Sequence, residues 1–125
     1  EYAYLKVADT SKTPRMYWRD KEYETAAVAY IALQRQDSTQ AVIRESEVNG
    51  IGYTLFREKE YDNAITVLEM NVALYPESDN VYDSLGDAYL RKGDSLQAYH
   101  NYNKALELNS GNKRAKEFVK SYKKD

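Results

Sequence analysis

The sequence contains no cysteine, which excludes a disulfide framework and any metal site built from thiolates. Two prolines and five glycines among 125 residues are too few for a loop-rich or all-β fold. No apolar run is long enough to cross a bilayer. The single histidine, His100, has no nucleophile and no orienting partner at a recognisable spacing. We therefore expect a protein without catalytic residues, metal ligands or cofactors, and without membrane insertion.

Neither sign of charge dominates the chain. The net charge of −2 gives no indication of a nucleic-acid partner. Residues 113–125 carry six basic and two acidic side chains, whereas acidic side chains are in excess before them. This tail could contact an anionic partner, but its simpler interpretation is a solvated helix that complements an acidic body. The chain starts with Glu1 and not with Met, so we expect an excised piece whose lack of a signal peptide indicates nothing.

Two long stretches of the sequence repeat each other at a spacing of 34 residues. Residues 48–76 read VNGIGYTLFREKEYDNAITVLEMNVALYP, and residues 82–110 read YDSLGDAYLRKGDSLQAYHNYNKALELNS. Gly52 aligns with Gly86 in a pattern that is otherwise helical. This period and its Leu-Gly and Tyr positions are the signature of the tetratricopeptide repeat (TPR), a pair of antiparallel helices. Because a glycine inside a helix costs about 1 kcal/mol, we expect both glycines to permit close helix packing.

These patterns predict an all-α fold. It is a TPR-type α-solenoid of antiparallel helix pairs, with about two and a half repeats and a C-terminal capping helix. We expect an irregular segment or short helix over residues 1–20 and a TPR domain over residues 21–125. Within that domain we expect a half repeat, two repeats and the capping helix, at residues 21–40, 41–78, 79–112 and 113–124.

The half repeat is out of phase with the repeat that follows it. Ala26 and Ala64 hold equivalent positions in their helices but lie 38 residues apart. We therefore expect the intervening helix to start early, near Ala41, with one extra turn.

Several residues predict where helices begin and end. Asp94 and Gln97 form a D-x-x-Q pattern that predicts a capping box at the start of a helix. Pro76 predicts the end of the helix before it. The corresponding end in the second repeat has no proline, so Gly111 is the expected C-terminal cap.

The first twenty residues are not explained by the repeats. Residues 1–7 alternate polar and apolar side chains and weakly predict a strand, and Thr13-Pro14 predicts the start of a short helix. The sequence MYW at 16–18 is a dense aromatic patch. It either folds back as an N-terminal cap over the helix expected at 24–36, or contacts a preceding domain or a second copy of the chain.

A binding groove is expected on the concave face, which the first helix of each pair lines in this kind of solenoid. Arg57 and Arg91 hold equivalent positions there and could bind a carboxylate through bidentate hydrogen bonds. The alternative is pairing within the chain, with Glu58, Glu60 or Asp87. The predicted peptide-binding groove consists of Asn49, Tyr53, Phe56, Arg57, Asp83, Asp87 and Arg91.

The acidic residues of this groove share one helix face with Asp79. Paired carboxylates such as Asp83 and Asp87 could serve acid–base chemistry or cation binding. A solvated acidic face is the commoner cause of such a stripe, and it is the interpretation that we favour.

A narrower resemblance depends on the phrases NVALYPES and NVYDSLGDAYL, at residues 71–78 and 80–90. They are similar to the C-terminal TPR appendage of exported bacterial hydrolases, namely α/β-hydrolase esterases and serine β-lactamase-like enzymes. The resemblance implies a non-catalytic protein-interaction module in the periplasm or outside the cell, preceded by a hydrolase domain that would hold the catalytic residues. The alternative is a stand-alone adaptor that binds an extended peptide.

TPR proteins that clamp a C-terminal carboxylate use lysine and asparagine at groove positions. This chain has Asn49, Tyr53, Asp83 and Asp87 there, which argues against binding of a chaperone tail. Under either hypothesis the expected partner is a protein or a peptide.

Overall fold

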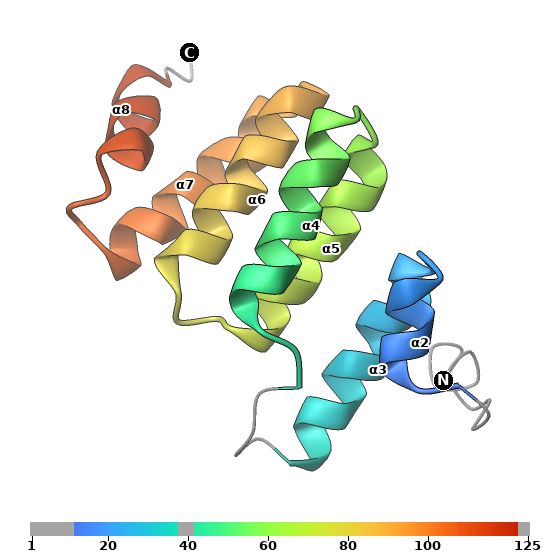
Figure 1. Cartoon of the computed structure of the whole chain (residues 1–125). Helices are drawn as coiled ribbons and strands as arrows, with labels where there is room; N and C mark the ends of the chain where they lie inside the picture. Colours follow the sequence, from blue (N-terminus) through green and yellow to red (C-terminus); the bar gives the residue numbers. More distant parts are fainter. Residues whose placement is uncertain (1–11, 38–41, 123–125) are drawn as a thin grey trace.

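The computed structural model describes residues 12–37 and 42–122, and within these ranges it contains helices and no strand. The chain forms a row of helix pairs, each pair stacked on the next (Figure 1). This arrangement confirms the expected all-α solenoid. The strand predicted over residues 1–7 lies outside the described residues. The helices are α2 (Pro14–Arg19), α3 (Tyr23–Gln36), α4 (Glu45–Arg57), α5 (Tyr61–Leu74), α6 (Asp79–Lys92), α7 (Ser95–Leu108) and α8 (Lys113–Ser121).

The 34-residue period fixes where the first helix of each pair begins. Helix α4 begins at Glu45, α6 at Asp79 and α8 at Lys113. Helix α5 packs against α4 and α7 packs against α6, while α8 covers α7 at the C-terminal end. The terminal helix α8 therefore occupies the place that the first helix of another repeat would take.

The connection between α3 and α4 differs from the prediction. Ala41 lies outside the described residues, and residues 42–44 are not helical, so α4 has no extra turn. The four additional residues lengthen the connection instead, which runs from 37 to 44, whereas the next connection between pairs runs from 75 to 78. The end of the longer connection is held in place because Ile43 is buried and its carbonyl accepts a hydrogen bond from the Tyr75 hydroxyl.

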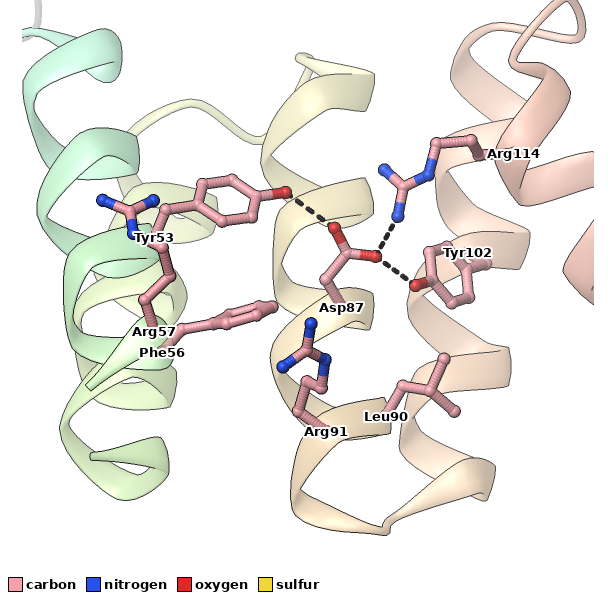
Figure 2. A pocket seen from close by; sticks show the side chains of 8 residues that line it. All are labelled: Tyr53, Phe56, Arg57, Asp87, Leu90, Arg91, Tyr102 and Arg114. Carbon is pink, nitrogen blue, oxygen red and sulfur yellow. Dashed lines mark hydrogen bonds and ion pairs between the residues drawn. The ribbon is translucent and has the colours of Figure 1, made fainter. Parts of the chain in front are cut away.

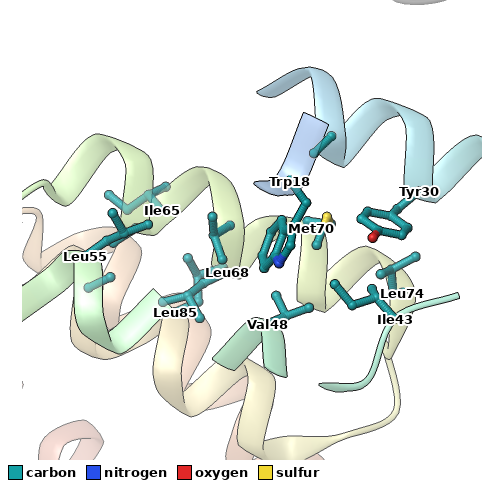
Figure 3. Packing of buried hydrophobic residues seen from close by; sticks show 14 of the residues in the cluster. Trp18, Tyr30, Ile43, Val48, Leu55, Ile65, Leu68, Met70, Leu74 and Leu85 are labelled. Carbon is teal, nitrogen blue, oxygen red and sulfur yellow. The ribbon is translucent and has the colours of Figure 1, made fainter. Parts of the chain in front are cut away.

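The aromatic patch at 16–18 folds back onto the half repeat. Trp18 is 7% exposed, and its indole meets the rings of Tyr23 and Tyr30 edge-on, at centroid distances of 5.6 and 6.3 Å. Tyr17 is buried as well. Figure 3 shows Trp18 among the aliphatic side chains of the core, beside Met70 of α5. The short helix α2 thus closes the N-terminal end of the core.

Both helical glycines lie under a side chain of the partner helix. A Cβ atom built on Gly52 would lie 2.4 Å from Leu68 Cδ2, and one on Gly86 would lie 2.9 Å from the ring of Tyr102. These distances are too short for any side chain larger than hydrogen without rearrangement. The packing role predicted for the glycines is confirmed.

Helix ends agree only in part with the sequence pattern. Asp94 caps α7, because its side chain accepts a hydrogen bond from the Gln97 backbone N–H at 3.1 Å. The predicted capping box is incomplete, because the Asp94 backbone N–H donates to the Tyr89 carbonyl and not to the Gln97 side chain. The cap predicted at Gly111 is wrong. Helix α7 ends at Leu108 with Asn109 as its extended C-cap, and Gly111 only donates its N–H to the Asn109 side chain.

Candidate peptide-binding groove

The chain has a hollow of about 490 Å³ between α4, α6, α7 and α8 (Figure 2). Five of the seven residues expected in the groove line it, and Asn49 and Asp83 do not. Its lining consists of Tyr53, Phe56, Arg57, Asp87, Leu90, Arg91, Tyr102 and Arg114.

Three lining residues are absent from the predicted groove, namely Leu90, Tyr102 and Arg114. Tyr102 comes from the second helix of a pair and Arg114 from the terminal helix α8. The repeat itself contains a signal for Arg114, because this residue lies one full period after Asn80, which is in the first turn of the groove helix α6.

Asp87 is the centre of the hydrogen-bond network in this hollow. Its Oδ2 accepts a hydrogen bond of 2.7 Å from the Tyr53 hydroxyl. Its Oδ1 accepts hydrogen bonds from the Tyr102 hydroxyl and from the Arg114 guanidinium (Figure 2). A carboxylate with three donors, one of them charged, tolerates burial that would otherwise be costly. The network therefore ties α6 to α4, α7 and α8.

The acidic face is not solvated, which corrects the expectation from the sequence. Asp83 and Asp87 are only 9% and 8% exposed. Arg114 forms ion pairs with both, at 3.1 Å to Asp83 Oδ2 and more closely to Asp87 Oδ1. Because α8 supplies this arginine, residues that resemble a surface stripe are covered in the folded chain.

Burial changes the acid–base properties of this network. Desolvation raises the pKa of the Asp83 carboxyl, although the neighbouring Arg114 partly opposes this change. Burial is also the main reason that the pKa of Tyr53 is raised, to about 12. The Tyr53 hydroxyl therefore stays protonated and donates to Asp87 throughout the physiological range.

Two oxygen atoms near this network have no hydrogen-bond partner. Asp83 Oδ1 and Asn49 Oδ1 are both buried and unpaired within the described residues. Buried polar atoms in folded proteins are nearly always paired, so each marks acceptor capacity that the chain itself leaves unused.

The arginines at equivalent repeat positions have no carboxylate partner within the described residues. The Arg91 guanidinium lies 5.0 Å from the centre of the Phe56 ring, which is the distance of a cation–π contact. Arg57 makes a 3.4 Å hydrogen bond with Thr54 Oγ1. Among the described residues neither arginine forms an ion pair, so the alternative pairing with Glu58, Glu60 or Asp87 is not observed.

The described residues outside this hollow show no metal-binding group and no membrane-spanning helix. Their acidic side chains and His100 include no group that could hold a metal ion. His100 is exposed on α7 and its ring lies 5.8 Å from that of Tyr99, away from the hollow. None of the described helices combines the length and apolarity needed to cross a membrane.

Comparison with known proteins gives a match to a family model, a curated relative and a similar solved structure. Residues 79–112 match the model of the tetratricopeptide repeat family. Heat shock protein STI1 of Saccharomyces cerevisiae is 41% identical over 59 residues, which are 47% of this chain and 10% of that protein. The chain therefore spans about a tenth of the length of this curated relative.

Among solved structures, the chain resembles the first TPR of Spaghetti (RPAP3) bound to the HSP90 peptide SRMEEVD. The TM-score is 0.58 at 19% sequence identity, and the match covers 94% of this chain and 87% of that one. At this identity the likeness shows the fold alone. The chain thus has the all-α fold of a TPR-type solenoid, and its second full repeat matches the tetratricopeptide family in sequence.

Proposed function

We propose that this chain is a non-catalytic interaction module that binds an extended acidic peptide in its concave groove. The observation that carries the proposal is the pair of unopposed guanidinium groups of Arg57 and Arg91 in one hollow. A single exposed arginine without a partner costs little folding stability and needs no ligand to explain it. Two arginines at equivalent positions of neighbouring repeats, however, match a ligand that crosses from α4 to α6. Arginine binds carboxylates through two parallel hydrogen bonds, which gives both affinity and orientation.

The groove is already arranged for such contacts. Phe56 is buried, and its ring supports the Arg91 guanidinium, so little side-chain freedom remains to be lost on binding. Tyr53 packs against Phe56 at a centroid distance of 5.2 Å and is held by its hydrogen bond to Asp87. Leu90, which is 40% exposed, adds an apolar contact at the edge of the hollow.

The acidic side chains of the groove do not oppose an acidic ligand. The sequence argued against a chaperone tail because Asp83 and Asp87 replace the residues of a carboxylate clamp. In the structure Arg114 pairs with both carboxylates, so the excess charge in the hollow is positive. The RPAP3 domain that this chain resembles binds an acidic peptide, and that ligand is a suitable first probe.

The test is the affinity of fluorescein-labelled SRMEEVD for the chain, measured by fluorescence anisotropy. We expect Arg57→Ala with Arg91→Ala to weaken binding by about tenfold to a hundredfold, because hydrogen bonds between charged groups contribute roughly 1.5–3 kcal/mol. The matched control is Arg19→Ala with Arg35→Ala, which removes the same charge from exposed positions outside the hollow. A peptide with glutamine and asparagine in place of its acids should bind no better to the parent than to the groove variant.

Two results would contradict the proposal. Equal losses of affinity in the groove variant and in its control would show that Arg57 and Arg91 contribute only non-specific electrostatic attraction. Equal binding of the acidic peptide and its neutral counterpart would show that carboxylates are not what the groove recognises.

Attachment to an exported hydrolase, which the sequence resemblance implies, is compatible with this role and concerns the other end of the solenoid. A hollow of about 220 Å³ lies there beside Tyr17. It is lined in part by Leu33, which is 41% exposed. A preceding hydrolase domain or a second copy would bury this apolar edge. Sequencing of the uncut gene tests the attachment directly, and a gene without an upstream hydrolase would remove it.

A further inference from the structure

The pairing of Arg114 with the buried acids is unusual in how its members are exposed. The Arg114 side chain is 60% exposed, whereas the side chains of Asp83 and Asp87 are 12% and 10% exposed. The two carboxylates are therefore buried, Asp87 in the lining of the hollow and Asp83 one helical turn before it, and the arginine lies over them from the solvent side. It comes from α8, a nine-residue helix at the end of the solenoid.

Asp87 keeps two of its three donors without this arginine, whereas Asp83 receives its hydrogen bond from Arg114. Tyr53 and Tyr102 donate to Asp87 from α4 and α7, on opposite sides of α6, and neither residue belongs to α8 (Figure 2). Their positions hold the carboxylate in the orientation in which it receives a cation. Preorganised acceptors of this kind lose little conformational freedom when a new donor arrives.

Arg114 does not use all of the acceptor capacity of the pair. It reaches only Oδ2 of Asp83, while Oδ1 of the same carboxylate is buried without a partner. An unpaired oxygen on a side chain that is 12% exposed marks acceptor capacity that the described residues leave unused.

We propose that Asp83 and Asp87 form a second subsite, which binds a cationic side chain of the peptide, and that Arg114 occupies it in the free chain. The ligand's lysine or arginine exchanges with Arg114, because two neighbouring buried carboxylates are costly when no cation neutralises them. The groove is then bipolar, with Arg57 and Arg91 for acidic residues of the ligand and the aspartate pair for a basic one. This inference builds on the proposed function, but its test uses an isolated cation, so that the two can fail independently.

The experiment titrates N-acetyl-arginine amide into the full chain and follows backbone amide signals by NMR. Its neutral counterpart, N-acetyl-citrulline amide, has nearly the same shape and no charge. The variants are Arg114→Ala, which vacates the subsite, and Lys116→Ala, which removes an exposed charge from the same helix.

We expect the arginine compound to shift the amides of Asp83 and Asp87 and to bind Arg114→Ala about tenfold more tightly than the parent, since no resident cation must be displaced. Lys116→Ala should bind as the parent does, and the citrulline compound should shift none of these signals. Adding Asp87→Asn to Arg114→Ala should abolish the gain.

Equal affinities of the parent and Arg114→Ala would overturn the proposal, as would equal effects of the charged and neutral compounds. If the α8 signals show that Arg114→Ala loosens that helix, Arg114→Gln takes its place, because glutamine retains most of the side chain and removes the charge. The same two outcomes then decide the question. Failure of SRMEEVD to bind would count against the acidic-peptide function alone and leave this result standing.

Discussion

The close approach of α5 to α4 at Gly52 gives a prediction whose sign opposes helix propensity. Alanine is the better helix former by about 1 kcal/mol, so Gly52→Ala should stabilise a helix that packs loosely. In this structure the new methyl carbon would lie 2.4 Å from Cδ2 and 2.7 Å from Cγ of Leu68. Leu68 is fully buried, and its Cγ is too near the backbone to move aside alone.

The expected magnitude follows from these two opposing effects. Inserting a methyl group into a packed core costs typically 1–3 kcal/mol, and contacts this short belong near the upper end of that range. After the gain in helix propensity, we expect Gly52→Ala to lower the free energy of unfolding by about 1–2 kcal/mol.

Gly50 offers a matched control two residues away in the same helix. It is exposed, and a Cβ built on it meets nothing within 4 Å. Gly50→Ala should therefore raise the free energy of unfolding by about 0.5–1 kcal/mol. Urea denaturation followed by circular dichroism measures both variants, and the pair should move in opposite directions.

A double variant tests the cause of the Gly52 effect. In a Leu68→Ala background the cavity left by leucine accommodates the extra methyl, so adding Gly52→Ala should become stabilising. If Gly52→Ala stabilises the parent chain, or keeps its full cost in that background, the close approach of the two helices is not the reason for this glycine.

Two further predictions concern the N-terminal end. Trp18→Ala should lower the free energy of unfolding by about 3–5 kcal/mol, because Trp18 is buried against Tyr23 and Tyr30, and a change below 1 kcal/mol in urea denaturation would show that it does not close the core. The hydrogen bond from Arg15 lowers the pKa of Glu47 below its ordinary value of 4.5. The Arg15–Glu47 pair therefore adds to the free energy of unfolding above pH 4.5, and this contribution is lost as the pH falls through the lower pKa of the folded state. Thermal melts across this acid range should show a weaker pH dependence in Arg15→Ala than in the parent, and identical slopes would contradict the linkage.

The helical scaffold could be predicted from the sequence because its cause is repeated in the sequence. Gly52 and Gly86 each accept a side chain from the partner helix, Leu68 in one pair and Tyr102 in the other. The same steric requirement recurs at one period, so it leaves a pattern that alignment of the chain with itself detects. The pairing of the helices followed from this pattern, although the start of α4 did not.

The connection before α4 could not be predicted in the same way. The spacing between Ala26 and Ala64 shows that four residues are added, but a longer helix and a longer loop satisfy it equally. Burial of Ile43 and the hydrogen bond that its carbonyl accepts from Tyr75 stabilise the longer loop. Tyr75 lies 32 residues after Ile43, so no local pattern reveals this contact.

The burial of the groove acids was missed for a related reason. Helical periodicity places Asp87 beside the apolar stripe, where an aspartate is usually solvated. Its donors come from Tyr53, Tyr102 and Arg114, on three other helices, so no local pattern contains them. Only the period links Arg114 to the groove, through the equivalent position of Asn80.

The same network couples the groove to the terminal helix. Arg114 is the residue of α8 that bonds to Asp87, and α8 otherwise rests on the small cluster of Tyr102, Ala115 and Phe118. If a ligand cation replaces Arg114, α8 loses its ion pairs with α6 and is held mainly by its apolar contacts with α7. Cation binding and loosening of α8 then favour each other. Because such coupling is reciprocal, each raises the equilibrium constant of the other by the same factor. Phe118→Ala should accordingly favour binding of N-acetyl-arginine amide, because it weakens the apolar contact of α8 and leaves the aspartate pair intact. The subsite and the terminal helix α8 then behave as one two-state element.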